Sequence, residues 1–282
     1  MNQQQSICSQ AREKTRAKRA ATQVFSFFTL RAAAFVNCAA LVIACVFLFV
    51  NGIGALDIEF VLDSPREMMT SGGVFPCLVG TFLLAAGAIA IALPFGVACA
   101  VWLNEYGKQG PVVDIVRLSV ANLAGVPSIV FGLFGLAFFV TALGFNVSLL
   151  SGILTLAVLT LPVIINTTEE ALKQVPRSWR DASLALGATK SQTIGRIVLP
   201  SALPGILTGA ILAVARAAGE TSAVMFTAAV FYTPKLPESV WSSVMALPYH
   251  MYVLATAGTE IEKTRPMQYG TCLLYTSPSP RD

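Results

Sequence analysis

DASLALGATKSQTIGRIVLP, residues 181–200, is a polar segment with a central glycine, and it lies between two long apolar runs. Ser178 and Asp181 stand three residues apart, a spacing that can start a short helix by capping its first turn. Gly187 can end that helix by taking a left-handed backbone conformation. The segment therefore predicts a short helix and a sharp bend, suited to contact with a protein partner and not with lipid.

A second helix is expected after the bend. Thr189 and Gln192 repeat the start signal three residues apart. Pro200 and Pro204 are expected to stop this second helix and to open the next apolar run, because proline is favoured in the first turn of a helix and disfavoured in its interior. The whole pattern is helix, bend, helix.

The same segment resembles the EAA motif of ABC-transporter permease subunits. The resemblance is carried by Asp181, Ala182, Ser183, Gly187, Ile197, Leu199 and Pro200. The family usually has Glu-Ala-Ala at the first three of these positions, so Asp181 and Ser183 depart from it, conservatively in charge and size. The resemblance implies a loop that docks in a cleft of an ATP-hydrolysing subunit and transmits its motion to the membrane helices. A cytoplasmic helical hairpin without such a partner is the alternative.

The composition excludes an ordinary soluble domain. The chain of 282 residues is 55% hydrophobic and 12% charged, which leaves too few polar residues to cover a globular surface. A membrane-crossing helix takes about 20 apolar residues. Runs of about this length occur at 32–50, 78–103, 118–143, 149–165 and 203–230. The fold class predicted is all-α, a polytopic transmembrane helical bundle with five complete spans. The first run has no cleavage site after it and is not a signal peptide.

Basic residues predict the orientation, because Lys and Arg beside membrane spans stay on the cytoplasmic side. They concentrate in the N-terminal tail, in the connection that holds Lys108 and Arg117, and in the loop around residues 181–200. These segments are therefore expected to be cytoplasmic. The net charge of +4 does not indicate nucleic acid, since the basic residues are spread over several flanks without a nucleic-acid-binding motif. The tail from Arg12 to Arg19 is either a solvated flank or a contact with membrane lipid.

Three regions are expected along the chain: a cytoplasmic N-terminal tail at 1–28, a transmembrane domain at 29–274 that contains the EAA-like coupling loop at 178–200, and a tail at 275–282. A sixth apolar run starts at Met267 and changes after Tyr275 to Thr-Ser-Pro-Ser-Pro-Arg-Asp. Nine residues cannot cross a bilayer. The end is interpreted as a truncated sixth span followed by a non-native tail, with a genuine five-span protein as the alternative.

The fifth apolar run contains two charged residues, Arg216 and Glu220. Each ionisable residue near the bilayer centre costs about 2.5–3.5 kcal/mol on insertion scales, so both need a compensating environment. Their four-residue spacing places them on one face of a continuous helix. A row of small residues at the same spacing is expected to let another helix approach closely: Gly205, Gly209, Ala213, Ala217 and Thr221.

Two interpretations of this pair stay open. In one, Arg216 and Glu220 only neutralise each other and lock the helix to its neighbours. In the other, the guanidinium of Arg216 binds a passing oxyanion, and Glu220 competes for the guanidinium so that the anion is released again.

Three stretches extend the resemblance: NLAGVPSIVFGLFGLAFF at 122–139, RAAGETSAVMFT at 216–227 and LPYHMYVLAT at 247–256. They are similar to the inner-membrane permease of the phosphate-specific ABC uptake system, PstA type, and the resemblance covers about residues 20–274. It implies an ABC importer permease fold in the cell inner membrane, phosphate as substrate, and Arg216 and Glu220 as pathway residues.

The resemblance also implies the partners: an ATP-binding ABC subunit at the cytoplasmic loop, a homologous sister permease subunit and a periplasmic phosphate-binding protein. The alternatives are a secondary transporter and an ABC permease for sulfate, molybdate or phosphonate. We expect no catalytic residues, no metal and no cofactor, since the sequence has no P-loop, no H-E-x-x-H and no G-x-S-x-G motif.

Two further expectations concern single residues. Pro127, with the glycines at 125, 132 and 135, is expected to bend the third span and open a gap along the pathway, although ordinary packing of small residues explains these positions nearly as well. His250, the one histidine, lies in a segment too short to span and is expected at the outer membrane interface.

Overall fold

The computed structural model describes residues 2–66, 69, 71–107, 110–257 and 261–275, so most of the expected tail at 275–282 lies outside the described residues. The chain divides into two units at residues 51 and 52. The first unit consists of the helix α1 (Asn2–Gly52) without its last residue, and this helix continues without a break from the polar N-terminal stretch through the first apolar run. The second unit contains all the other elements.

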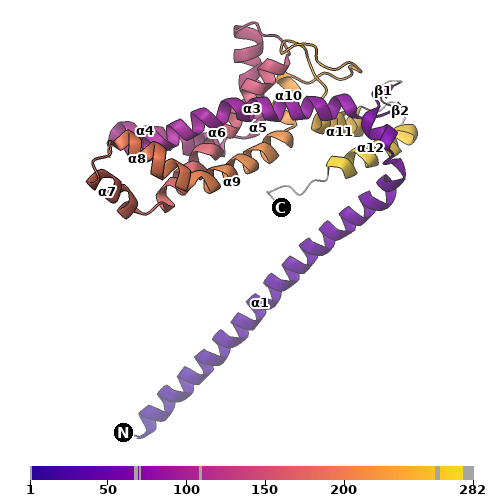
Figure 1. Cartoon of the computed structure of the whole chain (residues 1–282). Coiled ribbons are helices and arrows are strands. Elements are labelled where there is room, and N and C mark those ends of the chain that lie inside the picture. The colour runs from indigo at the N-terminus through magenta and orange to yellow at the C-terminus, as the bar shows by residue number, and fades with distance from the viewer. Residues whose placement is uncertain (1, 67–68, 70, 108–109, 258–260, 276–282) are drawn as a thin grey trace. The chain divides into compact units, whose positions relative to one another are not determined.

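Three long helices form the centre of the second unit: α3 (Phe75–Val101), α6 (Leu149–Gln174) and α9 (Leu199–Ala218). They run side by side in Figure 1. In the apolar 18-residue stretch of α6, 67% of the residues are buried, whereas 33% are buried in the corresponding stretches of the spans that contain α3 and α9. α6 is therefore the central helix on which the others pack.

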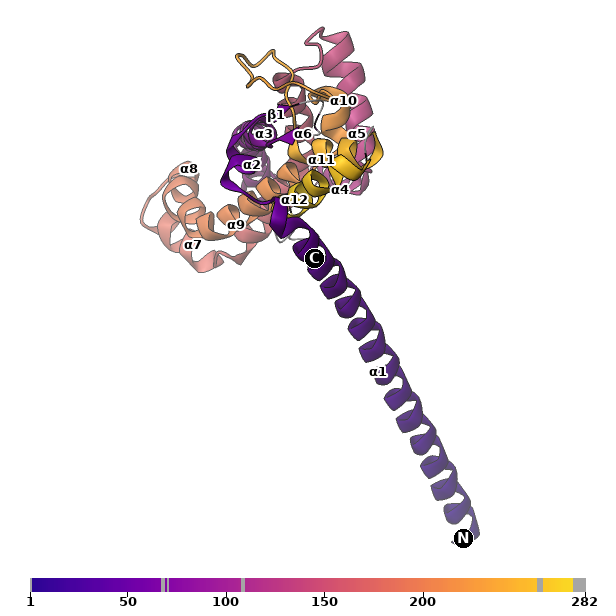
Figure 2. The same ribbon diagram turned by 90° about the vertical axis from the view of Figure 1, so that its right-hand side faces the viewer.

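The ends of this group carry different elements (Figure 1). At one end lie α7 (Arg177–Ala185) and α8 (Lys190–Thr193), which are also seen together in the turned view of Figure 2. At the other end lie the short helices η1 (Ile53–Ala55) and α2 (Ile58–Leu62), an antiparallel pair of strands, and α11 and α12. The strands are β1 (Pro65–Arg66) and β2 (Ser71–Gly72), and the two helices are Leu247–Thr256 and Ile261–Tyr275.

The third apolar run is two helices. α4 (Pro111–Gly125) and α5 (Ser128–Gly135) are separated by Val126 and Pro127 and bent by 103°, and α5 continues into the π-helical η4 (Leu136–Ala142). Pro127 lacks an N–H, and the residue before a proline is pushed out of the helical region, as the extended Val126 is. The predicted bend is confirmed, and Pro127 is its cause.

The glycines of this run have another role. A Cβ on Gly135 would stand 2.2 Å from Oγ1 of Thr155, and a Cβ on Gly132 would stand 2.8 Å from the carbonyl oxygen of Ser222. These two glycines allow close packing of α5 against α6 and against α10 (Ser222–Thr227). They do not make the bend.

By length and composition, four helices in the described part of the chain can cross a membrane, or five if the bent pair counts as one span. They overlap the five apolar runs predicted from the sequence, although the fifth span is Lys190–Ala218 and the predicted run at 203–230 extends past its end. The all-α polytopic fold is therefore confirmed. α12, which contains the sixth apolar run, has 15 residues and is shorter than a span.

Candidate functional site

The polar segment between α6 and α9 folds as a helical hairpin. α7 begins at Arg177, and its cap residue is the extended Pro176, so Ser178 is not the cap that we expected and the helix starts two residues earlier. α6 ends before it, at Gln174. At its other end, Gly187 has φ +83 and donates to Leu184, while Ala188 donates to Ser183. This is the Schellman pattern, and it confirms the predicted left-handed stop at Gly187.

The second helix of the hairpin starts where the sequence predicts. The hydroxyl of Thr189 accepts from the backbone of Gln192, and the amide oxygen of Gln192 accepts from the backbone of Thr189 at 2.9 Å. The Ser183 hydroxyl lies 2.9 Å from that of Thr193 and is buried. Because this bond joins α7 to α8, the two helices form one piece. Ser183 thus has a structural role that an alanine could not perform.

Ile197, Leu199 and Pro200 lie in the continuous helix that follows, so the prediction that Pro200 and Pro204 stop the second helix is wrong. α8 continues through η5 (Ile194–Val198), a π-helical turn, directly into α9. The Leu199 N–H bonds five residues back, to Ile194. Pro200 directly follows the wider π turn, and Pro204 lies further inside the same helix, so the two prolines are accommodated within a continuous helix.

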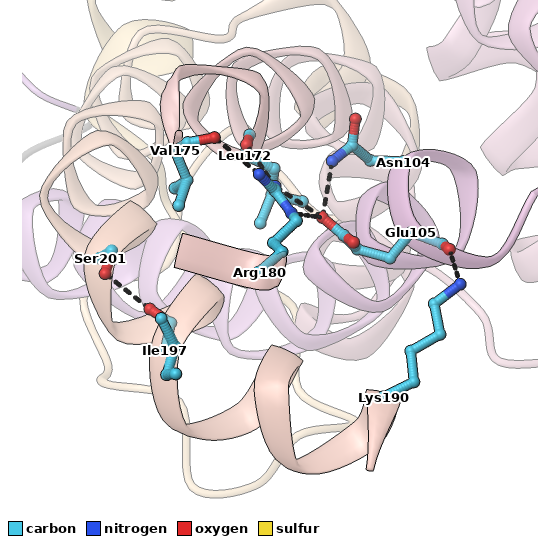
Figure 3. Close-up of polar contacts among 8 residues, drawn as sticks. All are labelled: Asn104, Glu105, Leu172, Val175, Arg180, Lys190, Ile197 and Ser201. Carbon is cyan, nitrogen blue, oxygen red and sulfur yellow. Dashed lines mark hydrogen bonds and ion pairs between the residues drawn. The ribbon is translucent and has the colours of Figure 1, made fainter. Parts of the chain in front are cut away.

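Glu105 contacts both helices of this hairpin from the end of α3 (Figure 3). It lies in η3 (Trp102–Tyr106), a π-helical continuation of α3. Its Oε1 accepts from Nη2 of Arg180 at 2.7 Å, from Nε of Arg180 at 3.1 Å and from Asn104 at 2.9 Å. Its backbone oxygen accepts from Nζ of Lys190. The sequence does not reveal this residue, because nothing in its neighbourhood indicates a partner 75 positions away.

Arg180 also donates to the end of α6. Its Nη1 bonds the carbonyl of Val175 at 2.6 Å, and its Nη2 bonds that of Leu172 at 2.9 Å. A pocket of about 300 Å³ opens beside this cluster. Its lining consists of Asn104, Glu105, Lys173, Val175, Arg177, Arg180 and Asp181. Asp181 lines this pocket and is exposed. Ala182 is exposed on the same helix, whereas Ser183 is buried.

The charged pair of the fifth run is arranged differently from the prediction. α9 ends at Ala218, so Arg216 lies on its last turn, while Glu220 follows the cap residue Gly219 and belongs to no helix. The prediction of a shared helix face is therefore wrong, because the helical spacing stops at the glycine between them. Arg216 is partly buried, and the Glu220 side chain is buried, with 7% of the residue exposed.

Two serines, missed at the sequence level, complete this region. The Ser222 hydroxyl donates to Oε1 of Glu220 at 2.8 Å, and Ser128 Oγ lies 2.8 Å from Ser222 Oγ. A hydroxyl has one hydrogen, so with that of Ser222 directed to Glu220, Ser128 is the donor to Ser222. Ser128 begins α5 and Ser222 begins α10. The hydrogen-bond chain therefore joins the breaks of the two interrupted apolar runs.

The row of small residues packs as predicted over most of its length. A Cβ on Gly209 would stand 2.1 Å from Oγ1 of Thr167, and one on Gly205 would stand 2.6 Å from Cβ of Ala171, so α9 lies directly against α6. Ala213 and Ala217 are buried as well. Thr221 lies beyond the end of α9 and does not continue the row.

His250 lies within α11 and is 1% exposed, so its side chain is buried inside the protein; its position at the outer membrane interface stays a prediction. Neither ring nitrogen has a hydrogen-bond partner in the described part of the chain. Burial lowers its pKa to about 4. Among the described residues, no group of three or more His, Cys, Asp or Glu side chains is placed to hold a metal ion.

These features define a class: a multi-pass α-helical membrane protein with interrupted spans and a helical hairpin at the end of its bundle. The model of one family, the binding-protein-dependent transport system inner membrane component, matches residues 92–258. The match covers more than half of the chain, and the chain belongs to this family.

Individual relatives support the same assignment. The probable ABC transporter permease protein YqgI of Bacillus subtilis (strain 168) is 36% identical over 210 residues, 73% of this chain and 71% of that protein. The phosphate transport system permease protein PstA of Xylella fastidiosa (strain Temecula1) is 32% identical over 236 residues, 79% of this chain and 82% of that protein. PstA of Mycobacterium leprae is 42% identical over 193 residues, 68% of this chain and 62% of that protein.

A solved structure shares the fold. A chain of the MetNI methionine ABC transporter, crystallised in inward-facing conformations, superposes with a TM-score of 0.51 at 23% identity. The superposition covers 72% of this chain and 88% of that chain. The predicted ABC importer permease fold is confirmed.

Proposed function

We propose that this chain is the membrane permease subunit of an ATP-driven ABC importer that moves inorganic phosphate into the cytoplasm. The observation that carries the proposal is the rigid hairpin of α7 and α8 at the end of the membrane bundle, in a member of the permease family. The named relatives that are phosphate permeases support phosphate as the substrate.

The hairpin is suited to docking an ATP-binding subunit. Large apolar side chains are exposed on and just after α7, with fractions of 51% for Trp179, 47% for Leu184 and 90% for Leu186. Exposed apolar groups beside exposed polar ones, here Asp181 and Arg177, are typical of a protein interface. We therefore assign ATP hydrolysis to a separate partner subunit that contacts this hairpin, and the coupling to residues 181–200.

The transport path is assigned to the region around the interrupted helices. A guanidinium fork matches the geometry of a tetrahedral oxyanion, and Arg216 supplies one beside the break that contains Glu220. Non-helical backbone deep in a membrane protein is tolerated where it lines a cavity or is buried in protein. A sister permease subunit would complete the path, and a periplasmic binding protein would deliver the anion.

In this proposal, residues 29–274 are the transport domain, residues 1–28 are a cytoplasmic tail, and the N-terminus and the hairpin share the cytoplasmic side. The distribution of Lys and Arg supports this orientation. A cysteine placed at the exposed Ala182 should react with a membrane-impermeant maleimide only in inside-out vesicles. Reaction in right-side-out vesicles would contradict the orientation.

The test of the function is uptake of labelled phosphate by vesicles that contain this subunit with its ATP-binding subunit, sister permease and binding protein. We expect uptake that requires ATP and that excess sulfate does not suppress. Suppression by sulfate, molybdate or phosphonate at equal concentration would identify another oxyanion as the substrate. Uptake driven by an ion gradient without ATP would identify a secondary transporter instead.

A further inference from the structure

The hairpin of α7 and α8 contacts a third helix, to which it is not adjacent in the sequence. α6 precedes the hairpin and α9 follows it, so both are joined to it covalently. α3 ends some 70 residues earlier, yet its π-helical extension η3 carries Glu105 into contact with both hairpin helices. The side chain of Glu105 accepts from Arg180 on α7, and its backbone oxygen accepts from Lys190 on α8.

The contact between Glu105 and α7 is a buried ion pair with several hydrogen bonds. The side chains of Arg180 and Glu105 are 17% and 8% exposed, so their bonds are protected from water. Arg180 makes two bonds to one carboxylate oxygen and two to the carbonyls of Val175 and Leu172. Charge-assisted bonds of this kind are about twice as strong as neutral ones. Arg180 is thereby held between the end of α3 and the end of α6.

The contact with α8 is independent of the Glu105 carboxylate. Nζ of Lys190 bonds the backbone oxygen of Glu105 and also lies 4.9 Å from the ring centre of Tyr106, the next residue of η3. A cation over an aromatic ring adds a further attraction. Because the Ser183–Thr193 bond joins α7 to α8, the two contacts fix the whole hairpin to η3.

We propose that Glu105 is the positioning residue through which movement of the hairpin is passed to α3. This inference rests on the proposed coupling of the hairpin to an ATP-binding subunit. Displacement of a rigid hairpin must displace every element that is bonded to it, so α3 moves with α6 and α9. ATP-driven movement then acts on three central helices, although only two of them are adjacent to the hairpin in sequence.

A pair that only stabilises the fold gives a different result from a pair that transmits movement. Loss of a stabilising pair lowers the amount of assembled transporter but leaves the ATP hydrolysed per phosphate imported unchanged. Loss of a transmitting pair raises that ratio while hydrolysis continues. The ratio, measured per assembled complex, therefore separates the two roles.

The experiment measures ATP hydrolysis and uptake of labelled phosphate by the complete transporter in proteoliposomes. In Glu105→Gln, which keeps the size of the side chain and the backbone bond to Lys190, we expect the ratio of ATP to phosphate to rise about tenfold, the factor expected when a charge-assisted bond is lost from the transmitting state. The double variant Glu105→Gln/Arg180→Gln should be no worse than the worse single variant, since the two side chains act as a unit.

Glu170→Gln is the matched control, because Glu170 is an exposed carboxylate near the end of α6 that Arg180 contacts, and it is not bonded to the hairpin in the described contacts. It should keep the wild-type ratio. A Glu105→Gln ratio equal to that of the control would overturn the inference. If Glu105→Gln fails to assemble, Arg180→Lys decides: it keeps the positive charge but loses the two bonds from the guanidinium to Glu105, and an unchanged ratio in that variant would also overturn the inference. Absence of ATP-driven uptake in the wild type would instead contradict the proposed function.

Discussion

Arg216 and Glu220 are four positions apart in the sequence, but a helix end lies between them. Gly219 caps α9, and Glu220 then accepts a hydrogen bond from Ser222 instead of continuing a helix face. The two residues therefore have different environments. Arg216 belongs to the end of a long helix, while Glu220 belongs to a hydrogen-bond chain that joins two interrupted runs.

The first prediction concerns Arg216. In Arg216→Ala, we expect phosphate uptake to fall about tenfold to a hundredfold, because a charge-assisted fork to the anion is lost. Assembly and basal ATP hydrolysis should persist. Arg265→Ala, which removes an exposed guanidinium from α12, outside both the hairpin and the charged pair, is the control and should transport normally. Uptake that survives in Arg216→Ala would remove this residue from the pathway.

The second prediction concerns the hydroxyl chain. Ser222→Ala takes the donor away from the buried Glu220 carboxylate, a loss that costs about 1–3 kcal/mol. The thermal inactivation midpoint of the purified transporter should fall by several degrees, and uptake should decrease with it.

Ser119→Ala is the comparison for this change, because the exposed Ser119 hydroxyl bonds only within its own helix among the described contacts. Its midpoint should stay at the wild-type value. Equal midpoints for Ser222→Ala and Ser119→Ala would show that the chain does not hold the two breaks together.

At the scale of elements, the hairpin shows what local sequence can predict. Gly187 and the Thr189–Gln192 pair were predicted correctly because caps depend on residues within one turn of each other. The continuation of α8 into α9 was not predicted, because a proline signals a helix end whether or not a preceding π turn accommodates it. Glu105 was missed for a third reason: its partners are distant in sequence.

The third prediction concerns the bend of the hairpin. Gly187→Pro is incompatible with φ +83, since the proline ring fixes φ near −65°, and it removes the N–H that bonds to Leu184. We expect ATP hydrolysis to continue without phosphate uptake while the spans remain inserted.

Gly54→Ala is a suitable control for the bend, because Gly54 lies outside residues 181–200 and a Cβ there would meet nothing within 4 Å. This variant should keep the wild-type ratio of ATP to phosphate. Normal coupling in Gly187→Pro would refute the role assigned to the hairpin, whatever the control does.

At the scale of the whole molecule, hydropathy predicted the number and position of the apolar runs and the all-α class. It did not predict that two of the runs are interrupted, because the mean hydropathy of a segment is the same whether its backbone is one straight helix or two helices with a break between them. For α4 and α5 the signal was Pro127, which we used. For α9 and α10 the break falls at Gly219 and Glu220, where no proline marks it.

The fourth prediction concerns stability against pH. His250 is the one histidine of the chain, and burial lowers its pKa to about 4 from an ordinary value of 6.5. Between these values the unfolded chain binds a proton that the folded chain does not, so stability falls as the pH drops through this window. The difference amounts to about 3 kcal/mol at pH 4.

Thermal inactivation midpoints of the purified protein in detergent, measured at pH 7 and pH 5, test this prediction. The midpoint of the wild type should fall more between the two values than that of His250→Phe, which keeps an aromatic ring without a titrating group. The same fall in both proteins would mean that other groups cause the pH dependence.

The continuity of α8, η5 and α9 has a mechanical consequence. Lys190–Ala218 is a single rod of 29 residues, about 40 Å long at 1.5 Å per residue. One end is the hairpin, and the other end is the break where the hydroxyl of Ser222 reaches Glu220. A tilt of about 5° about the hairpin end swings the far end by about 3.5 Å, more than the length of that hydrogen bond. In a lever of these proportions, a small tilt at the hairpin displaces the far end by more than that hydrogen bond spans.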